Sequence, residues 1–180
     1  MRNTKVINLI GAPGTGKSTI ASELFARMKW LGYSVELVSE YAKELVWEQR
    51  HETMKNEVYL FGKQHHRFFR LQGKVDFIIT DRPLILSLHY NNVYGDKSIE
   101  YANFVRHEVN KLDNINIFLE RTKPYVTEGR NQSEEESIEF GIQIKQTLDD
   151  NSIKYIIEKA LPDTVSDNIL KMITSTSIQL

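Results

Sequence analysis

The fold of this 180-residue chain is decided by the stretch Gly11-Ala12-Pro13-Gly14-Thr15-Gly16-Lys17-Ser18. This stretch satisfies the pattern G-x-x-x-x-G-K-[ST]. Its glycines let the backbone curl tightly, so that successive N–H groups point at one polyphosphate. A chance match somewhere in 180 residues has odds on the order of one in a hundred at an ordinary glycine usage of ~7%. The stretch therefore predicts a loop that binds a nucleoside triphosphate.

The segments on either side of this loop support the prediction. Before it, Val6–Ile10 is a short apolar run of a kind typical of a buried strand. After it, apolar residues recur at helical spacing from Ser18 to Leu31, and Gly32 is a natural stop. A helix there turns its N-terminus, with its unsatisfied N–H donors, toward the phosphates. A dinucleotide-binding fold is excluded because G-x-G-x-x-G does not fit the loop.

The loop residues have separate expected roles. Lys17 is expected to reach the β and γ phosphates and to act in catalysis, and the Ser18 hydroxyl to bind Mg²⁺. Further nucleotide contacts are expected from the rest of the loop and two other residues: Gly11, Ala12, Pro13, Gly14, Thr15, Gly16, Thr19 and Arg121. The expected cofactors are therefore ATP and Mg²⁺, although the sequence does not firmly separate ATP from GTP.

Strand-like and helix-like segments alternate along the rest of the chain. Further strands are predicted at 35–39, 75–80, 115–119 and 155–157. Helices are predicted at 41–50, 57–71, 84–91 after Pro83, 98–112, 133–150 with a capping box at Ser133, and 163–173. This alternation predicts an α/β fold with three α/β/α layers around a five-stranded, mostly parallel sheet. We expect a single domain over 1–180, with an exposed lid loop at about 121–133.

Composition limits the class of protein. Lys and Arg number 23 and Asp and Glu 24, which gives a formal net charge of -1. That balance argues against a protein whose main task is to coat nucleic acid or an anionic membrane. Without cysteine, the chain has no disulfide, Cys-ligated metal site or thiol nucleophile. No stretch approaches the ~20 apolar residues that cross a bilayer, and the N-terminal apolar run is too short for a signal sequence, so a cytoplasmic location is expected.

Two acidic residues follow predicted strands, at the edge where an open α/β sheet binds its ligands. Glu40 follows the second strand, where it either accepts a proton from an attacking hydroxyl or holds a sugar hydroxyl. Its alternative role is a cap for the helix starting at Tyr41. Asp81 follows the third strand, where a carboxylate holds Mg²⁺ or acts in catalysis, unless it is a helix N-cap before Pro83. The sequence does not decide which carboxylate is the general base.

Three arginines are candidates for contacts with the phosphates. Arg82 follows Asp81 and is expected to touch the transferred phosphoryl group, unless it forms only a surface salt bridge. Arg121 and Arg130 bracket the lid loop, which small phosphotransferases need in order to exclude water. Arg130 is favoured as the closing arginine because Gly129 permits a close approach, and a solvated loop arginine is its alternative.

The chain resembles the NadR-type P-loop family, which includes the nicotinamide riboside kinase domain of a bacterial NAD-biosynthesis regulator. The resemblance rests on six segments: Gly11–Ser18, Glu40–Leu45, Phe61–His65, Ile79–Asp81, Pro124–Arg130 and Asn151–Tyr155. It implies a P-loop NTPase fold and ATP-dependent phosphorylation of a nucleoside-like hydroxyl. It also implies that Lys17 and Ser18 take the nucleotide. Glu40 and Asp81 then take the acceptor hydroxyl and the metal, and Arg130 belongs to the lid.

Three further residues are candidates for the acceptor pocket. Gln64 lies on the predicted helix between the second and third strands, where it either hydrogen-bonds a base edge or belongs to ordinary helix packing. Tyr41 either lines the pocket or packs against its neighbours. Tyr125 lies near the position at which the resembled kinase has a tryptophan, and the resemblance implies that its ring stacks on a flat part of the acceptor.

The combined expectation is an ATP- and Mg²⁺-dependent kinase of a nucleoside or nucleoside-like metabolite. Two alternatives stay open. In the first, the acceptor is a nucleotide or a modified base in DNA, and a nucleic-acid backbone meets the basic stretch Lys63, Arg67, Arg70 and Lys74. In the second, the chain is a nucleotide-binding ATPase or switch module with little transfer activity. The oligomeric state is left open by the sequence.

Overall fold

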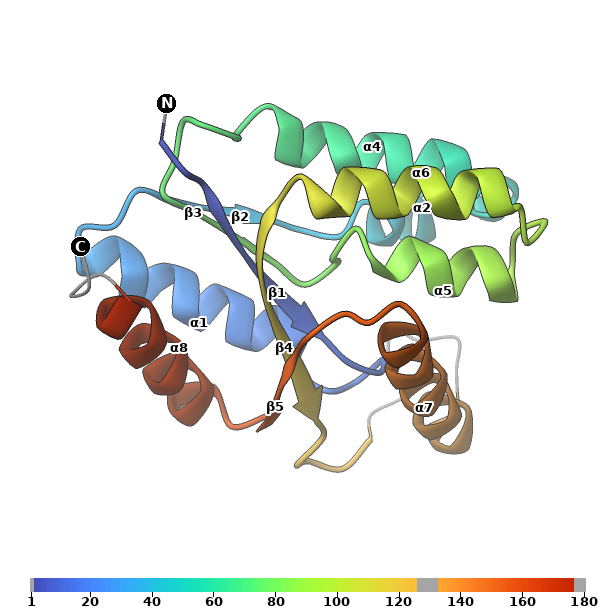
Figure 1. Cartoon of the computed structure of the whole chain (residues 1–180). Helices are drawn as coiled ribbons and strands as arrows, with labels where there is room; N and C mark the ends of the chain where they lie inside the picture. Colours follow the sequence, from blue (N-terminus) through green and yellow to red (C-terminus); the bar gives the residue numbers. More distant parts are fainter. Residues whose placement is uncertain (1, 126–132, 177–180) are drawn as a thin grey trace.

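A parallel sheet forms the centre of the protein (Figure 1). The computed structural model describes residues 2–125 and 133–176. Within them the strands are Lys5–Ile10 (β1), Val35–Val38 (β2), Phe77–Thr80 (β3), Asp113–Glu120 (β4) and Ile156–Lys159 (β5). The five strands lie in the order β2-β3-β1-β4-β5, and neighbouring strands pair in parallel throughout. The predicted five-stranded sheet is confirmed, and it is wholly rather than mostly parallel.

Helices cover both faces of the sheet (Figure 1). They are Lys17–Trp30 (α1), Ala42–Trp47 (α2), His51–Met54 (α3), Glu57–Phe69 (α4), Leu86–Val93 (α5), Ile99–Asn110 (α6), Glu134–Asp150 (α7) and Pro162–Thr176 (α8). One core packs α1 and α8 against the sheet, and a second packs α4, α5, α6 and α7 against its other face. The predicted three-layer α/β/α arrangement is confirmed. No helix in the described ranges is both long and apolar enough to cross a membrane.

Alternate residues of β1 belong to the two separate hydrophobic cores. Ile7 and Leu9 pack into the core that contains α1 and α8. Val6 and Ile10 pack into the core on the side of α4 to α7. All four side chains are fully buried, as is typical of a central parallel strand covered on both faces. The end of β1 is therefore a rigid base for the loop that follows it.

The register brings the carboxyl ends of three strands to one edge of the sheet. Thr80 of β3 pairs with both Asn8 of β1 and Val38 of β2. The loop after β1, Glu40 after β2 and Asp81 after β3 therefore emerge at the same edge, where open α/β sheets bind their ligands.

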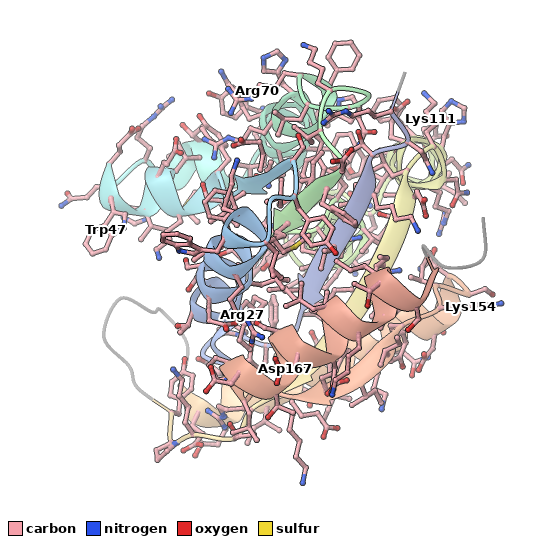
Figure 2. The ribbon with its side chains drawn as sticks, turned by 90° about the vertical axis from the view of Figure 1, so that its left-hand side faces the viewer. Arg27, Trp47, Arg70, Lys111, Lys154 and Asp167 are labelled. Atoms are coloured by element: carbon pink, nitrogen blue, oxygen red, sulfur yellow. The ribbon has the colours of Figure 1, made fainter. Side chains whose placement is uncertain are left out.

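An ion pair adds to the packing of α1 against α8. Figure 2 shows Arg27 of α1 close to Asp167 of α8, and the two side chains form a salt bridge. Arg27 also lies 3.2 Å from Glu23, one turn earlier on α1. Helices α1 and α8 are thus joined by charge as well as by apolar contacts. Elsewhere on the molecule, Trp47 projects from α2, and 74% of it is exposed.

The single helix predicted over 41–50 is wrong. The chain instead forms α2 and α3, with a break at Gln49, whose φ of 57° is left-handed. The Arg50 N–H donates to the carbonyl oxygen of Leu45 at 2.9 Å, which closes the end of α2. Both halves carry good helix formers, so the spacing of apolar residues does not reveal the turn between them.

Several element boundaries also differ from the prediction, and for two of them the structure shows the bond or pairing that sets the boundary. α5 begins at Leu86 rather than at 84, because a turn comes first, closed by the Leu86 N–H to the Pro83 carbonyl oxygen at 3.2 Å. β5 covers 156–159 rather than 155–157, because its pairing with β4 begins at Ile156. A local turn therefore sets the first boundary, and pairing with the distant strand β4 sets the second.

Candidate active site

Two glycines allow the sharp path of the loop after β1. Gly16 has a left-handed φ of 92° and is the N-cap of α1, where it brings no side chain in front of the first amides. Gly11 has a φ of 155°, and a Cβ at this position would lie 2.8 Å from the carbonyl oxygen of Leu119 in β4. The N-terminus of α1 therefore offers uncapped N–H groups and the positive end of the helix dipole.

Lys17 lies across this loop. Its Nζ donates to the carbonyl oxygens of Gly11 at 2.8 Å and Ala12 at 2.9 Å. The Thr15 hydroxyl donates to the same Ala12 oxygen at 3.0 Å. These bonds keep the loop curled and hold the Lys17 ammonium against the loop backbone, at the end of α1 where an anion is favoured.

Helix α7 also contacts the phosphate loop. The Ser137 hydroxyl donates to the carbonyl oxygen of Pro13 at 2.7 Å. Gly141 passes so close that a Cβ there would lie 3.2 Å from the Ala12 Cβ. The predicted capping box at Ser133 is present at the start of α7. The phosphate loop and the helix after the lid segment are therefore held in a fixed relation that the sequence did not reveal.

Arg121 follows β4 and connects the lid segment to α7. Its Nη2 lies 2.7 Å from Glu134 Oε1, and its guanidinium lies 5.1 Å from the centre of the Tyr125 ring. Its Nη1 is buried and has no hydrogen-bond partner in the described part of the chain. Arg121 is thus tied to the start of α7, and its contact with the nucleotide stays a prediction.

A second cation from the segment after β4 lies over the start of α1. The Nζ of Lys123, which the sequence did not single out, is 3.8 Å from the place that a Cβ on Gly16 would occupy. Its position next to the uncapped amides suits a contact with phosphate. Arg130 falls within 126–132, outside the described residues.

Arg82 connects the residues that follow β2 and β3. Its Nε lies 3.4 Å from Glu40 Oε1, and its guanidinium lies 4.0 Å from the centre of the Tyr90 ring. Because Arg82 is buried, the pair with Glu40 is not the surface salt bridge that the sequence left open. The Oδ1 atom of Asp81 is buried, and it has no hydrogen-bond partner among residues 2–125 and 133–176. One edge of the sheet therefore holds two carboxylates and one buried cation.

The capping roles left open for the two carboxylates do not occur. The N-cap residue of α2 is Tyr41 and that of α5 is Ile85, and neither helix has a side-chain cap. Glu40 is instead paired with Arg82, and Asp81 precedes a turn rather than a helix. Both carboxylates thus remain at the edge of the sheet without a capping function.

Two buried titratable side chains are affected by the charge of Arg82. Glu57, on the first turn of α4, is 6% exposed, and His89 of α5 is 2% exposed. Burial raises the pKa of Glu57, and the charge of Arg82 partly offsets this rise. Burial, together with the Arg82 charge, lowers the pKa of His89 to about 4. Neither residue is predicted from the sequence, although Glu57 lies in line with Leu60 and Phe61 on the buried face of α4. A charged residue on such a face is a signal of a special role.

Gln64 lies beneath this edge, with its amide bonded to the backbone. Its Nε2 donates to the carbonyl oxygens of Ser39 and Arg82, both at 3.3 Å, and its Oε1 accepts from the Tyr41 N–H at 3.0 Å. Gln64 therefore ties the end of β2 to the end of β3, and its contact with an acceptor stays a prediction. The half-buried Tyr41 shares a hydroxyl–hydroxyl bond of 2.8 Å with Tyr59.

The family model of the AAA domain matches residues 6–162. The chain belongs to this AAA domain family (AAA_28). The matched range contains the phosphate loop, both carboxylates and α7. A search of curated proteins finds no significant match to this AAA domain.

Solved structures of kinase-type P-loop proteins share the fold of this AAA domain. A NadR protein in complex with NR has a TM-score of 0.72 at 18% identity, over 94% of this chain and 51% of that one. A NadR protein in complex with NAD and AMP-PNP has a TM-score of 0.63 at 19% identity, over 86% of this chain and 44% of that one. Thymidylate kinase from Ehrlichia chaffeensis has a TM-score of 0.64 at 12% identity, over 95% and 99% of the two chains.

These likenesses confirm the predicted P-loop fold and the NadR-type resemblance of the AAA domain. The chain spans about half the length of the two NadR chains. At these identities the likeness shows the fold, and the chemistry depends on the residues of this chain.

The oxygen atoms at this edge fit a Mg²⁺ ion bound together with phosphates. Among residues 2–125 and 133–176 of the AAA domain, no three His, Cys, Asp or Glu side chains are grouped to hold a metal ion. Mg²⁺ is usually held by one or two protein oxygens, substrate phosphates and water. The exposed Ser18 hydroxyl on α1, next to the exposed Thr19, and the unpartnered Oδ1 of Asp81 match that small donor set.

Proposed function

We propose that this AAA domain is an ATP- and Mg²⁺-dependent kinase that transfers a γ-phosphoryl group to a hydroxyl of a nucleoside-like metabolite. The main observation is the edge of the sheet at which Glu40, Arg82 and Asp81 emerge beside the phosphate loop, with the Asp81 Oδ1 lacking a hydrogen-bond partner in the described ranges. A switch needs no such group of polar side chains beyond the loop. The fold shared with NadR and thymidylate kinase structures supports the same class of reaction.

The proposed reaction divides the work among few residues. The acceptor oxygen bonds to the γ-phosphorus, the bond to the bridging oxygen breaks, and ADP leaves with its electron pair. Glu40, held by Arg82, takes the proton of the hydroxyl. Mg²⁺, when bound, offsets phosphate charge, and Ser18 and Asp81 are the residues that would hold it.

Positive charge next to the transferred group comes from the loop and from beyond it. Lys17 and Arg82 stabilise the charge that spreads over the phosphoryl oxygens. Arg121 and Lys123 approach from the lid segment, and Arg130 is proposed as the residue that closes it. Tyr125, beside Arg121, is the proposed stacking surface for the flat part of the acceptor. A single domain over 1–180, a cytoplasmic location and ATP rather than GTP as the donor stay predictions.

A nucleotide acceptor is the second candidate. The likeness to thymidylate kinase favours it, because that likeness covers nearly the whole of both chains. A DNA acceptor has weaker support from the basic stretch, in which Arg67 is already paired with Glu44 at 2.5 Å and Lys63 lies over the Tyr59 ring.

A product screen tests the proposal. The protein is incubated with Mg-ATP and a panel of nucleosides, nicotinamide riboside, nucleotides and DNA, and new phosphorylated species are detected by mass. We expect a phosphorylated nucleoside-like product that disappears in Lys17→Ala. Tight nucleotide binding without modification of any acceptor would contradict the proposal and favour the switch.

A further inference from the structure

Three asparagine side chains lie on one face of the central sheet, on the side that α4 to α7 cover. The register pairs Asn8 of β1 with Asn116 of β4 and Val6 with Asn114, and paired residues of neighbouring strands point to the same face. Asn8 is only 3% exposed. Because an amide buried within an apolar strand is costly unless its polar atoms are bonded, each atom of this group needs a partner or a role.

The N–H groups of Asn8 and Asn114 are used within the protein. Asn8 Nδ2 donates to Oδ1 of Asn114 at 2.8 Å and to Oδ1 of Asn116 at 2.9 Å. Asn114 Nδ2 donates to the carbonyl oxygens of Val109 at 2.9 Å and Leu112 at 3.1 Å. Asn8 Oδ1, in contrast, accepts no hydrogen bond from the residues that the structure describes, and it is not one of the unpartnered polar atoms sealed from solvent. The network therefore leaves one acceptor free and open.

A cavity of about 270 Å³ is lined by Asn8 and lies between the sheet, the end of α6 and the turn after α7. Its apolar lining comes from Leu84, Ile85, Val109, Leu112 and Ile153. An apolar cavity of about 150 Å³ is enough to bind benzene. The cavity therefore has space for a compound of one or two rings, with Asn8 Oδ1 as the free acceptor on its sheet side.

The lining disfavours a charged ligand. It has no carboxylate among the described residues, so an organic cation buried there would lack a counter-charge. The one charged residue of that lining, Lys154, is exposed and lies at the edge of the molecule in Figure 2. An anion placed against Asn8 would meet an oxygen atom that only accepts hydrogen bonds. The cavity therefore suits an uncharged compound that carries a donor.

We propose that this cavity is a second ligand site, which binds an uncharged compound of one or two rings whose N–H group donates to Asn8 Oδ1. Nitrogen heterocycles with a ring N–H have this chemistry. Because the amide of Asn8 is held by its own two hydrogen bonds, its acceptor is already oriented before a ligand binds. Lys17, Glu40, Asp81 and Arg82 do not line the cavity, so the inference goes beyond the proposed kinase function and does not depend on it.

Indole and benzofuran test the need for a donor, because the two molecules have the same shape and differ in a ring N–H against a ring oxygen. Binding is followed without ATP, through the backbone amide shifts of the ¹⁵N-labelled protein. Indole is expected to bind the wild type saturably, with a Kd of about 1 mM or below, and to shift the amides of Ile85, Leu112 and Ile153. Benzofuran should bind at least about fivefold more weakly, because it has no hydrogen to donate.

Two variants change the site in different ways. Asn8→Leu removes the acceptor and keeps the volume, so indole should bind about fivefold more weakly and lose its preference over benzofuran. Because Asn8 also holds Asn114 and Asn116, a second variant leaves this network intact. Asn110→Trp adds a large ring at an exposed lining position of α6 and should weaken both compounds by about tenfold. The matched control is Asn103→Trp, at an exposed position of α6 outside the lining, and it should bind both compounds as the wild type does.

The expected result is a set of saturable shifts around the cavity, with a preference for indole that Asn8→Leu abolishes. If neither compound shifts the cavity residues at about 5 mM, water molecules alone occupy the cavity and the inference is overturned. Equal affinity of the wild type for indole and benzofuran would contradict the hydrogen bond to Asn8. Equal affinity of Asn110→Trp and Asn103→Trp for indole would contradict the assignment of binding to this cavity.

Discussion

Burial influences the charge of each titratable side chain around Arg82, and the effect differs from one residue to the next. Arg82 is paired with Glu40, stacked on Tyr90 and close enough to Glu57 and His89 to affect the pKa of both. A buried cation favours neighbours that either neutralise it or stay uncharged. Glu40 does the first, and burial favours the uncharged forms of Glu57 and His89.

His89 is expected to make the protein less stable in acid. Burial and the Arg82 charge lower its pKa to about 4 from 6.5, so between these values the unfolded chain binds more protons than the folded one. The stabilisation is complete above pH 6.5 and is lost as the pH falls toward 4, by about 3 kcal/mol in total. Removing the imidazole should therefore remove this part of the pH dependence.

Urea unfolding of the wild type and His89→Phe measures this effect. Between about pH 7 and about pH 5, the free energy of unfolding of the wild type should fall relative to the variant by about 2 kcal/mol. Parallel pH profiles of the two proteins would show that the folded state does not disfavour protonation of His89.

The variants Glu40→Gln and Asp81→Asn, which neutralise the two carboxylates at the edge, are expected to lose activity in different ways. Glu40→Gln removes the proposed proton acceptor, so kcat should fall by about 10²–10⁴-fold at any Mg²⁺ concentration. Asp81→Asn removes a proposed Mg²⁺ ligand, so the Mg²⁺ concentration for half-maximal activity should rise by about tenfold or more. Steady-state rates over a Mg²⁺ titration distinguish the two, and Glu36→Gln, within β2, is the control. If Asp81→Asn instead lowers kcat at every Mg²⁺ concentration and Glu40→Gln raises the Mg²⁺ requirement, the roles assigned to the two carboxylates would be exchanged.

Among the elements, the phosphate loop depends on its neighbours on two sides. β4 passes against Gly11, whose Cβ position is 2.8 Å from the Leu119 oxygen. α7 contacts Ala12 and Pro13 through Gly141 and Ser137. The curl of the loop is therefore a property of three packed elements as well as of its own glycines.

Gly11→Ala is expected to lower the free energy of unfolding by about 2 kcal/mol, because the new methyl group meets backbone and the φ of 155° suits glycine. Gly62→Ala is the matched control: in the interior of α4, with no heavy atom within 4 Å of the new Cβ, it should raise stability by up to about 1 kcal/mol. Urea unfolding measures both. Equal stability of the two variants would show that β4 yields to the methyl group at little cost.

Ser137→Ala tests the brace between α7 and the loop. Loss of the bond to the Pro13 carbonyl oxygen should lower the free energy of unfolding by about 1 kcal/mol. Because the loop is then held less firmly, KM for ATP should rise. The control is Ser175→Ala, whose hydroxyl bonds to the Lys171 carbonyl oxygen within α8. An unchanged KM in Ser137→Ala would mean that the loop keeps its form without this bond.

For the whole molecule, the sequence predicts the architecture and the edge that carries the site. A glycine loop between a buried strand and a helix, followed by alternating elements, leaves few arrangements open. Because parallel strands end at one edge, Glu40 and Asp81 can be placed near the phosphate loop without a structure. Each of these predictions uses only local pattern and a general rule of topology.

The parts that escaped prediction depend on contacts between distant segments. Glu57 and His89 lie on different helices, and the charge of Arg82 affects both only when α4 and α5 pack on the sheet. Lys123 approaches the loop only because β4 neighbours β1. The left-handed turn at Gln49 has no glycine to mark it. In each case the information lies in long-range packing rather than in the spacing of residues.

Following the γ-phosphoryl group itself decides whether this protein is a kinase. ATP carrying ¹⁸O in that group is incubated with Mg²⁺, the protein and the best nucleoside probe, and the products are separated by mass. The label should appear in the phosphorylated probe and should be lost from it in Lys17→Ala. Label found only in inorganic phosphate, released at a rate that does not depend on the probe, would contradict phosphoryl transfer to an acceptor.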